Sequence, residues 1–153
     1  MAIIDHLGAE VDLSDKYVVR LRLANRKGAH AGGLGTEALN GAIISGMIDC
    51  AMSIVGILHF RGRACGTVQF SIQFMKSVRD PHPFIECWAI RRSHSLLFVE
   101  ACILGRNQRS EVVATGMVAV SNSSPARQPS ETRWLAPAGM ELSSSLEPSS
   151  LVS

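Results

Sequence analysis

The chain has 153 residues, of which 46% are hydrophobic and 18% are charged. This composition fits one globular domain with a core of its own, and it excludes a wholly disordered chain. The formal net charge is only +2 and aromatic residues make up 5% of the chain, so neither charge nor a stacking surface predicts a nucleic-acid partner.

The first elements in chain order are a short N-terminal segment and a strand. Residues 1–16 predict a loosely ordered arm or a short helix, and they lack the basic start and the apolar run of a secretory signal. Residues 17–23 predict a half-buried strand, because apolar and basic side chains alternate along them. The apolar set is Val19, Leu21 and Leu23, and the basic set is Arg20 and Arg22. A glycine-rich connection follows.

A long apolar helix is predicted over residues 42–60, with Asn40 as its N-cap. The asparagine side chain is a good cap because it accepts a hydrogen bond from a free amide of the first turn. The helix is apolar nearly all round, so we expect it to be enclosed. A membrane span is disfavoured because Asp49 lies at its centre, where a carboxylate costs roughly 2.5–3.5 kcal/mol to insert. We therefore expect no membrane partner.

After the helix the hydrophobic period changes from 3.6 to 2, which predicts four strands joined as a meander. Their ranges are 67–75, 84–91, 96–104 and 112–120, with a hairpin loop over 105–110. The predicted fold class is therefore α+β, with one long helix against a five-stranded antiparallel sheet over residues 17–120. Residues 121–153 hold 10 serines and 4 of the 6 prolines, so we expect a mostly disordered tail there.

Asp49 is the first candidate for chemistry, because a carboxylate inside an apolar helix is rare unless it is paired or functional. It is either an acid/base group in a cleft or a packing residue at a polar or subunit contact. The amides of Gly41 and Ala42, at the positive end of the helix dipole, suit a developing oxyanion. Asn40 and Asp49 are roughly 13 Å apart along the helix, so one site needs two subunits.

The run from Leu39 to Asp49, LNGAIISGMID, resembles the signature of hotdog-fold acyl-CoA thioesterases of the PaaI-like, phenylacetate-pathway branch of the 4-hydroxybenzoyl-CoA thioesterase superfamily. That signature is His-Gly-Gly followed by a helix with Asp nine residues after the His. The resemblance continues through residues 66–75, 96–98 and 114–116, and it covers about residues 17–120. It implies a hotdog fold, in which an antiparallel sheet wraps a long central helix.

The resemblance also implies roles for single residues. Gly41 would supply an oxyanion-hole amide, Asp49 would be the general base or the nucleophile, and Thr67 would assist at the carboxylate or its water. Asn40 replaces the usual His, so it can cap the helix and donate to a carbonyl but cannot carry a proton. Ala42 replaces the second Gly, so a substrate has less room to approach the backbone amides there. Thr67 has the opposite parity to the apolar positions of its strand, so it reaches the site only if the strand twists or bulges.

Substrate contacts follow from the same resemblance. Arg91, Arg92 and His94 fall where members of this family often carry a basic residue, so we expect them to contact the phosphates of coenzyme A; ordinary solvation is the alternative. The acyl pocket is expected to be apolar, with candidate residues Phe70, Phe74, Met47 and Met52. The five histidines are interpreted as surface or loop residues, and neither they nor the four cysteines have metal-ligand spacing.

The function expected is hydrolysis of acyl-CoA to a free acid and coenzyme A, with no metal or organic cofactor. The protein is expected to be a cytoplasmic homo-oligomer, either a dimer or a dimer of dimers, since the cysteine usage suits a reducing compartment. Two alternatives stay open. One is an acyl-CoA-binding protein that has lost turnover, and the other is a hotdog hydratase or dehydratase, for which His59 is the one histidine near Asp49.

Overall fold

The computed structural model describes residues 2–32, 36–104 and 109–121. The predicted tail from residue 122 on and most of the predicted 105–110 loop lie outside the described residues. The helices are α1 (Ala2–Leu7) and α2 (Gly41–His59), with a short 3-10 helix η1 (Gly28–His30) between them. The strands are β1 (Ala9–Asp12), β2 (Val18–Leu23), β3 (Cys65–Phe74), β4 (Phe84–Arg92), β5 (Leu96–Leu104) and β6 (Ser110–Val120).

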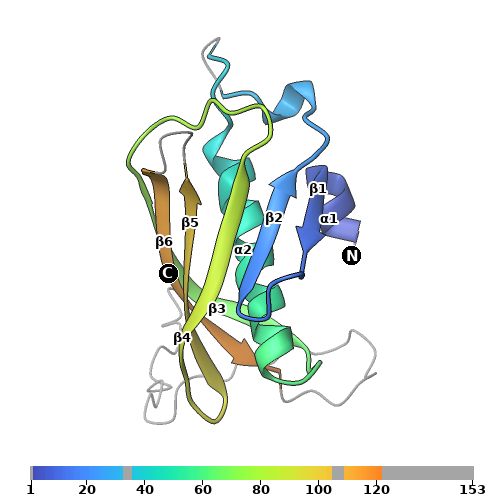
Figure 1. Cartoon of the computed structure of the whole chain (residues 1–153), viewed down its shortest axis with the longest axis vertical. Helices are drawn as coiled ribbons and strands as arrows, with labels where there is room; N and C mark the ends of the chain where they lie inside the picture. Colours follow the sequence, from blue (N-terminus) through green and yellow to red (C-terminus); the bar gives the residue numbers. More distant parts are fainter. Residues whose placement is uncertain (1, 33–35, 105–108, 122–153) are drawn as a thin grey trace, which may run out of the picture. The chain divides into compact units, whose positions relative to one another are not determined.

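One antiparallel sheet and the central helix make up the fold (Figure 1). The strand order is β1-β2-β4-β5-β6-β3. Helix α2 contacts every strand from β2 to β6, which requires the sheet to wrap around it. The α+β hotdog architecture predicted from the sequence is confirmed.

Within the described residues the sheet has six strands, so the predicted count of five is wrong. The additional strand, β1, comes from the N-terminal segment and pairs with β2. A sharp turn at Gly8 makes this possible, because its φ of 66° favours glycine and a Cβ there would lie 2.2 Å from the carbonyl oxygen of Asn25. The side chains of α1 that pack inward, Ile4 and Leu7, are buried.

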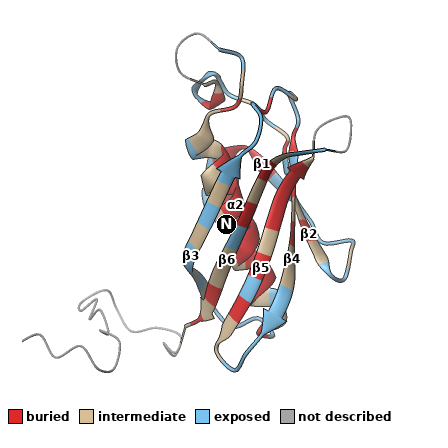
Figure 2. Ribbon diagram, turned by 90° about the vertical axis from the view of Figure 1, so that its left-hand side faces the viewer, coloured by how far each residue is buried: buried red, intermediate tan, exposed pale blue. Residues whose placement is uncertain are grey.

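The predicted meander of four strands is also wrong, because β3 pairs with β6 and not with β4. The segment between β3 and β4 carries the chain from one edge of the sheet to the other side of β5. Val78 anchors this segment, since its side chain is 1% exposed and its carbonyl accepts a hydrogen bond from the Leu39 amide at 2.8 Å. Strand β3 therefore lies at an edge of the sheet (Figure 2).

Helix α2 is enclosed on one side only, which corrects the expectation of an enclosed helix. By length and hydropathy it could cross a membrane, yet half of it is buried inside the fold. Its buried residues face the sheet, and a stripe on the other side is not buried. This open stripe consists of Ala42, Ser45, Gly46, Asp49 and Ser53.

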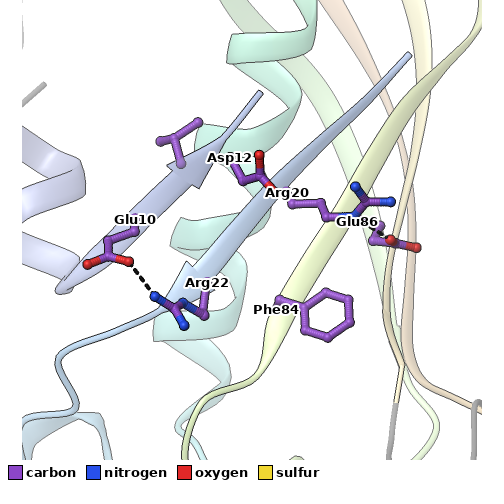
Figure 3. Close-up of a pocket in the computed structure, with 7 residues that line it drawn as sticks. Glu10, Asp12, Arg20, Arg22, Phe84 and Glu86 are labelled. Carbon is purple, nitrogen blue, oxygen red and sulfur yellow. Dashed lines mark hydrogen bonds and ion pairs between the residues drawn. The ribbon is translucent and has the colours of Figure 1, made fainter. Parts of the chain in front are cut away.

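The outer face of β1, β2 and β4 forms a groove of about 470 Å³ (Figure 3). Ion pairs cross it from strand to strand, with Nε of Arg20 2.7 Å from Glu86 and a terminal nitrogen of Arg22 2.7 Å from Glu10. The predicted alternation explains these pairs, because the arginines point outward where Val19, Leu21 and Leu23 are buried. The pairs join neighbouring strands, and ion pairs this open to solvent contribute little to stability.

Candidate active site

Asp49 lines a groove of about 470 Å³ between α2 and the edge strand β3. The residues of this groove are Ser45, Gly46, Asp49, Thr67, Val68, Gln69 and Phe70. Asp49 is half-buried in the single chain, not fully buried as its apolar neighbours suggested. Among the described residues no cation forms an ion pair with it. The carboxylate is therefore open to a water molecule or a substrate.

Thr67 joins Asp49 in this groove because β3 contains a bulge. The register with β6 shifts between Thr67 and Gln69, which places Val68 outside, 60% exposed. The bulge reverses the expected parity at this end of the strand, so Val68 does not belong to the buried apolar set. Thr67 is turned toward α2, and its hydroxyl oxygen lies 3.3 Å from that of Ser53. The sequence analysis required a twist or a bulge for Thr67 to reach the site, and the structure has the bulge.

Asn40 caps α2 as predicted, with Oδ1 accepting from the Ala42 amide at 2.8 Å. This bond engages the Ala42 amide, so only one of the two amides expected to face a substrate is free. The Gly41 amide donates to no acceptor in the described part of the chain. A Cβ on Gly41 would lie 3.4 Å from Cζ of Phe74, so that aromatic ring flanks the free amide.

The candidate residues are not all together in one chain. Gly41 and Asp49 are eight residues apart on α2, about 12 Å along its axis, so they cannot contact the same reacting atom. Arg91, Arg92 and His94 are exposed at the end of β4 and in the turn after it. The Arg92 guanidinium lies 4.9 Å from the ring centre of Phe60, which is the C-cap residue directly after α2.

The expected acyl-pocket residues divide into two groups. Phe70 lines the Asp49 groove and Phe74 lies beside Gly41. Met47 and Met52 are 1% and 0% exposed, so they belong to the core behind the helix and not to a pocket. Within the described residues there is no group of three metal-ligating side chains.

His30 is buried at 3% exposure, which corrects the interpretation of the histidines as surface or loop residues. Its Nδ1 accepts from the Lys27 amide at 3.2 Å, and its carbonyl accepts from the Asn40 amide. Burial, then the charges of Lys27, Arg26 and His6, lower the pKa of His30 below 6.5. The neutral ring therefore helps to fix the segment that leads into α2.

We expect the stability of the protein to fall in mild acid because of His30. Its folded-state pKa is depressed, so below about pH 6.5 the unfolded chain binds the proton more readily and unfolding is favoured. The thermal midpoint of the wild type should decrease between about pH 7 and pH 5. His30→Asn keeps a neutral acceptor near Nδ1, so its midpoint should depend less on pH; an unchanged slope would contradict the assignment.

Comparison with known proteins identifies the family. Residues 37–112 match the family model described as the thioesterase superfamily. The chain belongs to this superfamily. The matched region starts before the Asn40 cap and contains α2, β3, β4 and β5, so it includes Gly41, Asp49 and Thr67. Superfamily membership supports thioester hydrolysis as the general chemistry of the site.

Several solved structures share the fold of this chain. A thioesterase from Haemophilus influenzae has a TM-score of 0.69 and 15% identity, covering 78% of this chain and 82% of its own. The PaaI protein of the E. coli phenylacetic acid degradation operon has a TM-score of 0.69 and 12% identity, covering 81% and 87%. Zebrafish thioesterase superfamily member 2 has a TM-score of 0.67 and 15% identity, covering 78% and 91%. No curated protein sequence matches the chain.

Proposed function

We propose that this protein hydrolyses acyl-CoA thioesters to a free acid and coenzyme A. The observation that carries the proposal is the groove between α2 and β3, which the Asp49 carboxylate and Thr67 both line. A carboxylate that has no counter-ion among the described residues and shares a groove with a hydroxyl is suited to activating a nucleophile. We place the reaction in the cytoplasm, with no metal or organic cofactor.

The chemistry needs only groups that the chain supplies. The Gly41 amide donates to the thioester carbonyl, and its position at the start of α2 stabilises the negative charge that develops on that oxygen. Asp49 either accepts a proton from the water that attacks the carbonyl carbon, or attacks that carbon itself and forms an anhydride that water then cleaves. In both routes the carbon–sulfur bond breaks and its electron pair leaves with sulfur. The thiolate of coenzyme A then takes a proton, from Asp49 when that residue acted as the base and from water when it acted as the nucleophile. Thr67 orients the carboxylate or its water.

The 12 Å between Gly41 and Asp49 leads us to place each site between two subunits, with Gly41 from one chain and Asp49 from the other. Strand β3 lies at the edge of the sheet, and Val68, Phe74 and Met75 are exposed at or next to it. Pairing of β3 with its symmetry mate would give hydrogen-bond partners to the backbone groups of the open edge, and it would cover the open stripe of α2. Two such dimers can pair again into a tetramer.

We assign Arg91, Arg92 and His94 to the phosphates of coenzyme A. No acidic residue forms an ion pair with either arginine among the described residues, so both guanidinium groups are available to an anion. Arg92 lies beside Phe60, which is about 16 Å along α2 from Asp49, so a phosphate bound there would be well separated from the reacting carbonyl.

Hydrolysis of a panel of acyl-CoA thioesters, measured as released thiol, tests the proposed function. The expected result is steady turnover of at least one thioester, with the preferred acyl group given by the panel. Binding without release of thiol would support the non-catalytic alternative instead. Addition of water to an enoyl-CoA without release of thiol would support a hydratase.

A dimer or a dimer of dimers is expected in solution at micromolar concentration. Light scattering of the wild type should give a mass of two or four chains. Val68→Asp places a charge on the exposed edge strand and should shift the mass toward one chain, whereas Val68→Thr should not. A wild-type protein that stays monomeric would contradict both the assembly and the shared site.

A further inference from the structure

Ser53 is a polar residue of the groove region to which neither the sequence nor the proposed function gives a role. It lies one helical turn after Asp49, on the same face of α2, and it is half-buried. Its hydroxyl oxygen lies 3.3 Å from Oγ1 of Thr67, which is the contact that links the open stripe of α2 to the bulge of β3. Ser53 therefore contacts Thr67, one of the three groups that the proposed mechanism uses.

The behaviour of Ser45 shows what is unusual about Ser53. Ser45 lies one turn before Asp49 and donates its hydroxyl hydrogen to the Gly41 carbonyl at 2.8 Å, as serine commonly does inside a helix. The Ser53 hydroxyl oxygen instead lies within hydrogen-bond distance of the Thr67 hydroxyl on the neighbouring strand. Both serines are on the open stripe. Ser45 bonds to its own helix, whereas Ser53 contacts a candidate catalytic side chain.

The direction of the hydrogen bonds follows from what each group can do. A hydroxyl has one hydrogen and two lone pairs, whereas an ionised carboxylate only accepts. For Thr67 to donate to Asp49 or to a water molecule beside it, its own hydrogen must stay free. Ser53 leaves it free when the Ser53 hydroxyl donates to Oγ1 of Thr67. In this order, from Ser53 to Thr67 and on to Asp49 or its water, Thr67 keeps its own hydrogen for the Asp49 side of the groove.

We infer that Ser53 is a positioning residue, which holds the Thr67 hydroxyl toward Asp49 and acts on the reaction only through Thr67. This inference rests on the proposed thioester hydrolysis. It requires the effect of removing the Ser53 hydroxyl to depend on the presence of the Thr67 hydroxyl, because two groups that act in one chain of hydrogen bonds are energetically coupled.

A double-mutant cycle on the full-length protein tests the inference. The variants are Ser53→Ala, Thr67→Val and the two together, with kcat and KM measured on the best thioester of the panel. Ser53→Ala should lower kcat about three- to tenfold, the scale of one hydrogen bond, with KM little changed. In the Thr67→Val background the same substitution should lower kcat no further. Ser53→Thr keeps the hydroxyl and should restore most of the turnover.

Ser45→Ala is the matched control, since it also removes a serine hydroxyl from the same stripe. Its effect on kcat, whatever the size, should be the same with and without the Thr67 hydroxyl. Thermal midpoints show that each variant is folded, and alanine is well tolerated inside a helix.

Two results would overturn the inference and are distinguishable. If the wild type hydrolyses thioesters and Ser53→Ala lowers kcat by an equal factor in both Thr67 backgrounds, Ser53 has only a structural role and the proposed function stands. If the wild type releases no thiol from any member of the panel, the proposed function fails and the inference fails with it.

Discussion

Asp49→Asn is expected to lower kcat at least ~10²-fold, the scale of losing a general base or a nucleophile. Asparagine keeps the shape of the side chain but can neither accept the proton of water nor form an anhydride. Asp49 is half-buried on the open stripe of α2 and forms no ion pair within the described residues, so the loss of its charge leaves no buried partner unsatisfied. The thermal midpoint should therefore stay close to that of the wild type.

The control for this substitution is Asp12→Asn, which removes a carboxylate from β1 in the outer groove and should leave kcat as in the wild type. Released thiol measured under saturating substrate compares the two variants directly. A turnover of Asp49→Asn close to that of the wild type would contradict the role of Asp49 in either form, as base or as nucleophile.

The sequence predicts the elements of this fold well. Each element buries one face, and the hydrophobic residues of that face recur in the sequence with the period of a helix or a strand. Alternation in residues 17–23 correctly identified Val19, Leu21 and Leu23 as core residues of β2. The same pattern does not tell which strands pair with one another in the sheet. The position of β3 at the sheet edge depends on the crossing segment that Val78 anchors, and the sixth strand depends on the turn at Gly8. Both are tertiary features.

The candidate site was predicted in part. The Asn40 cap has a local cause and could be predicted from the sequence, as could the separation of roughly 13 Å between Asn40 and Asp49 along the helix. The contact between Ser53 and Thr67 could not, because it exists only after a bulge reverses the parity of β3 and after that strand lies beside the helix. The open stripe of α2 was missed because its small residues are compatible with either burial or exposure.

Gly41→Pro is expected to remove the oxyanion donor without breaking the helix. Gly41 is the first residue of α2, where proline is favoured, and its amide donates to no acceptor in the described residues. Asn40 has ψ of 133°, which is the region required of a residue before proline. We expect a folded protein whose kcat is about 10²- to 10³-fold lower, the scale of losing one oxyanion donor. Gly41→Ala keeps the amide hydrogen and should lose much less.

Mixing this variant with Asp49→Asn tests whether each site takes residues from two chains. In a hybrid dimer one site combines the intact Gly41 of the first chain with the intact Asp49 of the second, and the other site carries both substitutions. Random pairing makes half of the dimers hybrid, so a quarter of all sites are intact and coexpression of the two variants should give about a quarter of the wild-type turnover. Each variant alone should stay near its own low value. If the mixture shows no gain over the two parents, both groups act within one chain, and the 12 Å between them would have to be bridged by a movement of α2 that the packing of its buried face opposes.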